Sequence, residues 1–286
     1  MILERVFVAG AGLMGHGIAQ VLASTGRSVV LYEPDLARAE AGRDRIAGNL
    51  DRAVAKGRLD AVRAADALAR ISTTDELASV AQANLVIEAV FEDLAVKTAL
   101  LSELDGWAPA ACIFASNTSS ISIDRLASAV AEPRRARFVG LHFFSPVPVM
   151  PLIELIPGSA TDERTEAAMR DLAAALGKDV IVAADRPGFI VNRILMPLLA
   201  EAMRAFEEGV ATAEDIDTGA RIGLNHPMGP LELADFIGLD VCLGILRVLH
   251  EGLGQERFQP PAVLVALVAA GRLGQKSGQG FHRYPR

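Results

Sequence analysis

The sequence of 286 residues predicts an α/β fold: a doubly wound, mostly parallel sheet with an inserted helical hairpin, followed by an all-helical domain. Three observations predict it. Short apolar runs alternate with helical periodicity as far as residue 183, helical periodicity alone continues from residue 189, and a turn-forming segment, Asp185-Arg186-Pro187-Gly188, separates the two patterns. Two domains are typical of this length, so we expect them at residues 1–185 and 186–286.

The chain begins with a strand, a glycine turn and a helix. The apolar run Arg5–Ala9 leads into a Gly-x-Gly-x-x-Gly motif, after which apolar residues recur at helical spacing. The motif consists of Gly10, Ala11, Gly12, Leu13, Met14 and Gly15. Ser28–Tyr32 is the next expected strand, and Glu33 follows it, about 20 residues beyond the glycine turn. This context is typical of a Rossmann-like, dinucleotide-binding fold.

NAD is the predicted ligand of this turn. Its pyrophosphate would bind the N–H groups at the helix N-terminus. Glu33 would accept hydrogen bonds from the adenosine ribose and would repel a 2′-phosphate, which favours NAD over NADP. A structural glycine turn that binds no ligand is the alternative, and Arg38 is close enough in sequence to keep NADP open.

Residues 35–70 are rich in alanine and charge, with apolar positions at helical spacing, and Gly57 divides them. The segment is too long for a plain crossover, so we expect a helical hairpin inserted after the second strand. Arg52, Lys56 and Arg58 would gather near its tip. These three basic residues indicate either a solvated face or a contact with substrate.

Two further apolar runs, Ala83–Ala89 and Ala110–Ala115, are typical of parallel strands buried on both sheet faces. The loops that follow such strands face the cofactor crevice. Glu88 lies at the end of the first run, and Glu92 and Lys97 follow it. The second is followed by Ser116, Asn117, Thr118, Ser119 and Ser120. Such a cluster is typical of a helix cap or a turn, and here it also fits a polar site; both interpretations stay open.

The stretch RFVGLHFFSPVPVMPLIELI carries the candidate catalytic pair, His142 and Glu154. Phe138–Phe143 and Pro151–Ile156 are predicted strands, and the prolines between them hold the connection extended. The chain therefore doubles back, so a carboxylate on one strand can hydrogen-bond a histidine on the other and make it a general base. A core histidine beside a surface glutamate is the alternative.

The C-terminal part of the chain is predicted to be helical. A helix around Glu163–Leu176 and a last strand at Asp179–Ala183 precede it, and five helical segments follow from Phe189. The long apolar segments VCLGILRVL and AVLVALVAA exceed what a helical domain of this size needs, which favours a homodimer through this domain. The glycine-punctuated tail from Gly274 to Phe281 could reach back to the crevice.

Composition excludes several classes of protein. A net charge of −7 argues against a nucleic-acid partner, and no uncharged run is long enough to cross a membrane. Cys112 and Cys242 lie in apolar runs, which suits buried thiols, and no metal-ligand spacing occurs. The chain starts directly with a strand and shows no leader, so we expect a cytoplasmic protein. Of the other histidines, His16 is expected to face solvent, with an approach to a bound phosphate as the alternative, while His226, His250 and His282 are expected to be structural or exposed.

Over essentially its full length the sequence closely resembles the (S)-3-hydroxyacyl-CoA dehydrogenases, in particular the bacterial 3-hydroxybutyryl-CoA dehydrogenases. The resemblance rests on GAGLMGHGIAQ, FASNTSSISI, GLHFFSPVPVMPLIELI, PGFIVNR, PMGPLELADFIGLD and KSGQGF, in this order. It implies an NAD-dependent oxidoreductase that acts on a short-chain acyl-CoA. A dehydrogenase of a free hydroxy acid on the same fold, and a non-catalytic NAD-binding protein, are the alternatives.

The resemblance also implies roles for individual residues. His142 would be the catalytic base, Glu154 its orienting partner, Ser119 a hydrogen-bond donor to the reacting oxygen and Asn192 a further polar contact on substrate. The implied cofactor contacts are Gly10 to Gly15, Glu33, Glu92, Lys97, Ser119, Ser145 and Lys276. The implied CoA contacts are Asn49 and Lys56, together with Ser119 on the substrate. Many members have Asn at the position of Ser145, and Ser reaches less far than Asn does.

Overall fold

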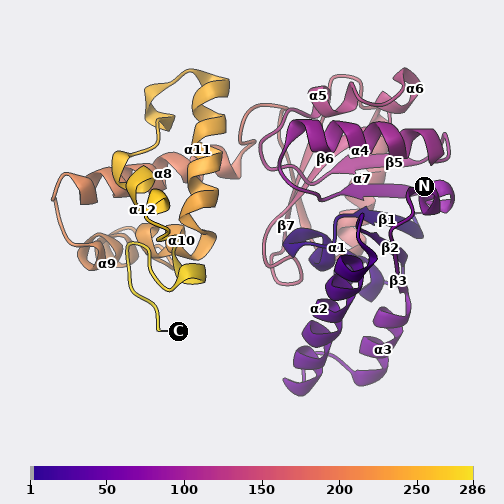
Figure 1. The fold of residues 1–286 in the computed structure, drawn as a ribbon, viewed down its shortest axis with the longest axis horizontal. Coiled ribbons are helices and arrows are strands. Elements are labelled where there is room, and N and C mark those ends of the chain that lie inside the picture. Colours follow the sequence, from indigo (N-terminus) through magenta and orange to yellow (C-terminus); the bar gives the residue numbers. More distant parts are fainter. Residues whose placement is uncertain (1–2, 286) are drawn as a thin grey trace. The chain divides into compact units, whose positions relative to one another are not determined.

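The computed structural model describes residues 3–285, which divide into two compact units (Figure 1). The chain passes from one unit to the other between Arg186 and Pro187, one residue beyond the expected boundary. No helix within residues 3–285 has the length and apolar character that crossing a membrane requires.

The N-terminal unit contains one eight-stranded sheet. Its strands are β1 (Arg5–Ala9), β2 (Ser28–Tyr32), β3 (Ile71–Thr74), β4 (Leu85–Glu88), β5 (Ile113–Ser116), β6 (Phe138–Phe143), β7 (Leu152–Pro157) and β8 (Asp179–Val182). Their order across the sheet is β3-β2-β1-β4-β5-β6-β7-β8. Strands β1 to β6 are parallel, β7 runs antiparallel to β6, and β8 is parallel to β7. The predicted doubly wound, mostly parallel sheet is therefore confirmed.

The strands at the middle of the sheet explain why the sequence shows continuous apolar runs. Four residues of β1, from Val6 to Ala9, and all four of β4 are buried. Helices cover both faces of a parallel sheet, so that a strand in its interior has no solvent-facing side. Side chains from β1, β2, β4, β6 and β7 join α1 and α7 in one hydrophobic core.

Two details of the sheet differ from the expectation. Strand β3 was not predicted, because its sequence, ISTT, contains three polar residues and lies at the edge of the sheet, where side chains stay partly exposed. Strand β5 begins at Ile113 rather than at Ala110, because the Cys112 N–H donates to the Pro109 carbonyl and closes a turn there.

The helices of this unit are α1 (Leu13–Ser24), α2 (Leu36–Ala55), α3 (Ala61–Ala69), α4 (Leu94–Trp107), α5 (Ile123–Ala127), α6 (Glu132–Arg135) and α7 (Glu163–Ala175), with a 3₁₀ turn at Leu77–Gln82. The short α5 and α6 were not predicted. Helices α2 and α3 form the predicted hairpin, which projects from the sheet near β2 and β3 (Figure 1). Asp35 and Asp60 cap their N-termini, and Gly57 adopts a positive φ of 64° in the turn between them.

The C-terminal unit is entirely helical, as predicted. It contains α8 (Val191–Glu207), α9 (Ala213–Gly223), α10 (Pro230–Ile237), α11 (Leu239–Leu253) and α12 (Ala262–Ala269), with 3₁₀ turns at Glu256–Phe258 and Gln275–Ser277. Helix α8 begins two residues later than expected, because Gly188 and Phe189 both have positive φ, which a right-handed helix does not allow. The tail packs on α10, where the buried Asp235 accepts from the Phe281 and His282 N–H groups.

The apolar surface of this unit lies only in part on the two apolar segments named above. Cys242, Leu243, Leu246 and Leu249 of the run VCLGILRVL belong to the unit's own core. Val241 of this run and Val265 of AVLVALVAA are exposed at 45% and 40%, but more strongly exposed apolar side chains, among them Ile194, Ile222 and Phe236, lie on other helices. Helical periodicity predicted how much apolar surface there is, but not which helices leave theirs exposed.

Both cysteines are buried and unpaired, as predicted. Burial raises the pKa of both thiols to about 12. Neither thiol therefore ionises near neutral pH, and neither is suited to act as a nucleophile.

Candidate active site

The glycine turn leaves room for a ligand at the start of α1. A Cβ on Gly15 would lie 1.7 Å from the Gly10 carbonyl oxygen, so only glycine allows helix and strand to pack this closely. A Cβ on Gly12 would meet nothing within 4 Å. No side chain caps the N-terminus of α1, so its N–H groups face this open space. The turn therefore fits a dinucleotide pyrophosphate.

Glu33 lies directly after β2 and is held against the glycine turn. Its Oε1 accepts a hydrogen bond of 2.8 Å from the Ala11 N–H. The carboxylate is largely buried at the carboxyl end of β2, where the adenosine ribose would lie in a fold of this kind. The side chain is thus oriented by the turn before any cofactor binds.

His142 and Glu154 are direct partners across the antiparallel pair β6 and β7. The Nδ1 atom of His142 lies 2.7 Å from Oε2 of Glu154. Glu154 is 0% exposed and His142 6%. The carboxylate accepts the Nδ1 proton and thereby orients the imidazole ring, which leaves Nε2 as the nitrogen suited to accept a proton.

The loop after β5 lies beside this pair. The Asn117 side-chain oxygen accepts from the Phe143 N–H at 2.9 Å, which ties the loop to the end of β6. Thr118 accepts from the Ile121 N–H at 2.9 Å and stabilises the turn. Asn117 and Thr118 are therefore structural, whereas Ser119, between Thr118 and the buried Ser120, is partly exposed. The structural interpretation of the polar cluster therefore applies to Asn117 and Thr118, and a functional role for Ser119 stays a prediction.

A buried ion-pair network supports the Ser119 loop. The Lys97 ammonium lies 2.6 Å from Oε1 of Glu88 and 3.2 Å from Oε2 of Glu92, and the Lys97 side chain is 1% exposed. Glu88, at the end of β4, also accepts from the Ser116 hydroxyl at 2.6 Å. Oε1 of Glu92 accepts from the Ser119 N–H at 2.8 Å. Lys97 thus acts on Glu92, and Glu92 orders the loop.

The ionisation of Glu92 follows from these contacts. Burial raises the pKa of its carboxyl, but Lys97 and the hydrogen bonds from Thr118, Ser119 and Ser120 outweigh burial. The pKa therefore lies below its ordinary value of 4.5. Glu92 is a carboxylate at neutral pH and accepts hydrogen bonds only.

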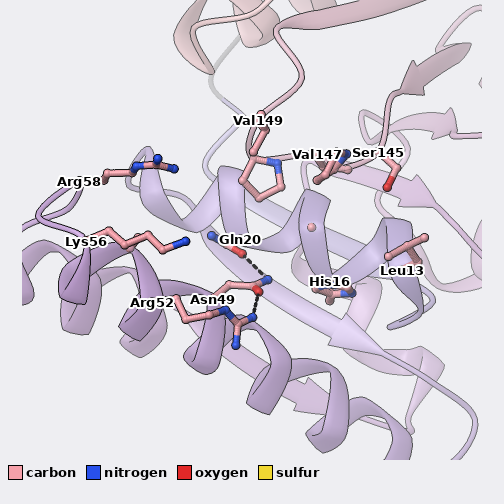
Figure 2. Close-up of a pocket in the computed structure, with 14 residues that line it drawn as sticks. Leu13, His16, Gln20, Asn49, Arg52, Lys56, Arg58, Ser145, Val147 and Val149 are labelled. Carbon is pink, nitrogen blue, oxygen red and sulfur yellow. Dashed lines mark hydrogen bonds between the residues drawn. The ribbon is translucent and has the colours of Figure 1, made fainter. Parts of the chain in front are cut away.

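A cavity of about 540 Å³ lies between α1, α2 and the loop that joins β6 to β7. Figure 2 shows Lys56 and Arg58 on one side of it and His16, Leu13 and Ser145 on the other. Its basic lining residues are Arg52, Lys56 and Arg58, and its apolar wall includes Val147 and Val149. A cavity with cationic and apolar walls fits a long ligand that carries phosphate at one end.

Lys178 anchors the apolar wall of this cavity. Its ammonium donates to the carbonyl oxygens of Val147 at 2.7 Å and Met150 at 2.6 Å. Burial lowers the pKa of Lys178. Lys178 was not among the expected site residues, because its contact with this loop depends on the packing of the turn between α7 and β8.

Two predicted site residues, Asn192 and Lys276, belong to the C-terminal unit. Asn192 lies in the first turn of α8 and is largely buried. Lys276 donates to Oδ2 of Asp240 at 2.7 Å. Their relation to His142 stays a prediction.

The expectation for His16 is wrong. The side chain is 9% exposed, and its Nδ1 donates to the Gly12 carbonyl at 2.6 Å. The loop between β6 and β7 packs over this part of α1, since a Cβ on Gly17 would lie 3.0 Å from Val147. A helix's first turn predicts exposure only where no distant loop covers it. His282 is structural, as expected, with its Nε2 donating to Asp217 at 2.7 Å.

The functional groups described in the N-terminal unit follow the carboxyl ends of neighbouring parallel strands. Gly10 follows β1, Glu92 follows β4, Ser119 follows β5, and His142 lies next to the end of β6. Parallel strands place these ends at one edge of the sheet, where α/β proteins bind dinucleotides. A nucleotide-binding turn beside an oriented imidazole defines a nicotinamide-dependent oxidoreductase.

Comparison with known proteins agrees with this class and specifies it further. Residues 5–186 match the family described as 3-hydroxyacyl-CoA dehydrogenase, NAD binding domain, and residues 188–284 match the C-terminal domain of 3-hydroxyacyl-CoA dehydrogenase. The chain belongs to the 3-hydroxyacyl-CoA dehydrogenase family, whose cofactor is NAD.

Its similarity to individual members extends over whole chains. It is 47% identical to 3-hydroxybutyryl-CoA dehydrogenase of Bradyrhizobium diazoefficiens, over 99% of this chain and 96% of that protein. It is 44% identical to the human mitochondrial hydroxyacyl-coenzyme A dehydrogenase, over 99% and 92%. The crystal structure of (S)-3-hydroxybutyryl-CoA dehydrogenase PaaH1 from Ralstonia eutropha matches all of both chains with a TM-score of 0.95 and 42% identity.

Proposed function

We propose that this protein interconverts (S)-3-hydroxyacyl-CoA and 3-ketoacyl-CoA, with 3-hydroxybutyryl-CoA as the substrate of choice. The observation that carries the proposal is the buried hydrogen bond of 2.7 Å between His142 Nδ1 and Glu154 Oε2, at the sheet edge that also carries the glycine turn. This arrangement supplies a general base beside a nicotinamide site. A secondary alcohol needs both for its oxidation.

Oxidation of the substrate removes a hydride from C3 and a proton from the hydroxyl oxygen. NAD, when bound, accepts the hydride. His142 accepts the hydroxyl proton at Nε2, and the Glu154 carboxylate stabilises the imidazolium that results. Ser119 donates a hydrogen bond to the reacting oxygen, and Asn192 makes a further polar contact with the substrate. In the reverse direction the imidazolium returns the proton to the 3-keto oxygen.

The cofactor contacts proposed here divide into direct and supporting ones. Glu33 receives the adenosine ribose and the glycine turn the pyrophosphate. Glu92 orders the loop of Ser119, and Lys97 supports Glu92, because its ammonium is buried between two carboxylates. The full set is Gly10, Ala11, Gly12, Leu13, Met14, Gly15, Glu33, Glu92, Lys97, Ser119, Ser145 and Lys276.

A coenzyme A thioester as substrate is supported by the cavity beside the hairpin. Coenzyme A carries a pyrophosphate and a ribose 3′-phosphate, and the cavity contains Asn49, Lys56 and two arginines. The proposed short acyl chain rests on the relatives named 3-hydroxybutyryl-CoA dehydrogenase.

The C-terminal unit is proposed to pair with a second copy of the chain. Ile222 is 80% exposed, and Ile194 and Phe236 are also strongly exposed. Apolar side chains of this size are typical of a surface that another protein covers. A second copy would form a symmetric dimer, the commonest assembly of soluble proteins.

One assay tests the proposed reaction. Loss of NADH absorbance is followed with acetoacetyl-CoA, and in parallel with free acetoacetate. We expect turnover with acetoacetyl-CoA and no turnover with free acetoacetate. Turnover with acetoacetate alone would assign the protein to dehydrogenases of free hydroxy acids, and tight NADH binding without turnover of either compound would identify a non-catalytic NAD-binding protein.

A further inference from the structure

The three cations of the cavity beside the hairpin have no anionic partner in the described part of the chain. Arg52, Lys56 and Arg58 form no ion pair with a carboxylate within residues 3–285. Uncompensated positive charges that line one cavity repel each other, so an anionic ligand stabilises them. One of the three differs from the others in how it is held.

Arg52 is held by a chain of two amide side chains (Figure 2). Its Nη2 donates to Oδ1 of Asn49 at 2.5 Å. Nδ2 of Asn49 donates to Oε1 of Gln20 at 3.1 Å. Gln20 lies on α1 and is 8% exposed, whereas Arg52 lies on α2 and is exposed. The chain of hydrogen bonds therefore runs from a buried side chain on α1 to an exposed, charged one on α2.

The order of donors and acceptors gives this chain a direction. Arg52 can only donate, so Asn49 turns its oxygen toward Arg52 and its NH₂ toward the carbonyl oxygen of Gln20. The reverse orientation of Asn49 would oppose two donors to each other, because a guanidinium has no acceptor. Gln20 thus holds Asn49 in place from α1, and Asn49 in turn presents its oxygen to Arg52.

The hydrogen bond between Gln20 and Asn49 is sufficient to connect α1 with α2. The third member adds no further contact between the two helices, since Arg52 and Asn49 are both on α2. It does restrict a long side chain, which costs conformational entropy. Restricting an arginine at the wall of a cavity is useful where its planar fork must meet a phosphate in two-point contact.

We propose that Arg52 is the residue that selects for a phosphate-bearing acyl carrier, and that Gln20, acting through Asn49, is its positioning residue. The proposal rests on the proposed function, and it assigns Asn49 to holding Arg52 rather than to direct contact with coenzyme A. In this proposal Lys56 and Arg58 attract the phosphates by their charge alone. Arg52, whose guanidinium is held in one orientation, makes a two-point hydrogen-bonded contact with a phosphate group.

Two thioester substrates distinguish a contact of Arg52 with the phosphates from a general effect of Arg52 on catalysis or folding. Acetoacetyl-CoA carries the phosphates, and acetoacetyl-pantetheine carries the same acyl group and thiol arm without them. We expect Arg52→Ala to raise the KM for acetoacetyl-CoA about 10-fold, with kcat unchanged, because an exposed charge-assisted contact of this kind contributes little more. The KM for acetoacetyl-pantetheine should stay the same.

Gln20→Met keeps the length of the side chain and removes its amide. We expect it to raise the KM for acetoacetyl-CoA about 3-fold to 5-fold, with no effect on the pantetheine thioester. In the Arg52→Ala background the same change should have no further effect, since Gln20 would then have nothing to position.

Asn49→Leu breaks the chain of hydrogen bonds at its middle and serves as a second variant if Gln20→Met is poorly folded. Arg63→Ala on α3 is the control for a change of net charge away from the cavity.

Calorimetric binding of coenzyme A and of adenosine 3′,5′-bisphosphate tests the proposal without turnover. We expect both to bind more weakly to Arg52→Ala and to Gln20→Met than to the wild type. Equal affinities would overturn the proposal, as would a KM effect of Gln20→Met that persists in the Arg52→Ala background. If the wild type turns over neither thioester but binds coenzyme A through Arg52, the proposed reaction fails and the assignment of Arg52 stands.

Discussion

His142 and Glu154 face each other across β6 and β7, with His142 Nδ1 2.7 Å from Glu154 Oε2. The pair is buried and lies on adjacent antiparallel strands, so its geometry is held by the hydrogen-bond ladder of the sheet. Rotation of the imidazole is restricted before substrate arrives. A general base that accepts a proton from one hydroxyl group in one orientation needs this rigidity.

Substitution of this pair should reduce turnover without loss of the cofactor. We expect His142→Ala or Glu154→Gln to lower kcat by on the order of 10² to 10⁴. The first substitution removes the proposed base, and the second removes the carboxylate that orients it and stabilises the imidazolium. NAD affinity, measured by calorimetry, should be unchanged, since neither residue lies in the glycine turn. Near-normal turnover in either variant would refute the assignment.

Glu33 should determine the preference for NAD. We expect Glu33→Ala to lower kcat/KM with NAD roughly 10-fold to 100-fold, because contacts with the ribose hydroxyls are lost. The value with NADP should change less, since repulsion of the 2′-phosphate is lost as well. The ratio of the two values is the measurement, and a ratio that does not change would exclude Glu33 from the ribose site.

Lys97 should be essential for the stability of the N-terminal unit. Lys97→Met leaves the fully buried Glu88 carboxylate without its cation, and we expect a loss of about 3–5 kcal/mol in the free energy of unfolding. The double variant Glu88→Gln, Lys97→Met removes both charges and should recover most of that loss. Urea unfolding followed by the fluorescence of Trp107, the single tryptophan, reports on this unit. A double variant as unstable as the single one would contradict the argument.

Glu92 should contribute stability above its ordinary pKa and lose it in acid. Its pKa is lower in the folded chain than the ordinary 4.5. The ionised carboxylate therefore stabilises the fold at pH values above 4.5, and the contribution disappears as the pH falls through the lowered pKa. The difference between wild type and Glu92→Gln should be constant from pH 5 to 7 and shrink below pH 4.5.

That difference should stay below about 1 kcal/mol, because the Glu92 side chain is 37% exposed and solvent screens its charge. Urea unfolding at pH 3.5 and at pH 6 provides the comparison. An unchanged difference at the two pH values would show that Glu92 does not titrate as its contacts imply.

The exposed apolar side chains of the C-terminal unit should support a dimer. We expect a mass in solution of twice the 30.2 kDa of one chain by light scattering at micromolar concentration. Ile222→Asp should shift the protein towards the monomer. Val62→Asp is a matched control, since Val62 is 68% exposed on α3 of the other unit. A monomeric wild type would end the proposal.

Much of the site could be predicted from the sequence because its signals are local. The glycine motif, the strand before it and Glu33 after the next strand lie within 30 residues, and their spacing reflects one strand-turn-helix unit. His142 and Glu154 could be paired because consecutive strands joined by a short connection commonly lie side by side. The change from alternating to purely helical periodicity near Asp185 predicted a change of architecture, for the same local reason.

Only the tertiary structure decided which partner each polar side chain takes. Lys97 was expected among the cofactor contacts, which stays a prediction, and only the structure shows that its ammonium is buried between Glu88 and Glu92. His16 was expected in solvent, yet a loop more than 120 residues further along packs beside it. Periodicity records which face of an element is buried, but it carries no information about the distant element that covers that face. The sequence by itself therefore determined the fold class and the pairing of His142 with Glu154, and the packing of distant segments determined how Lys97, His16 and Arg52 are held.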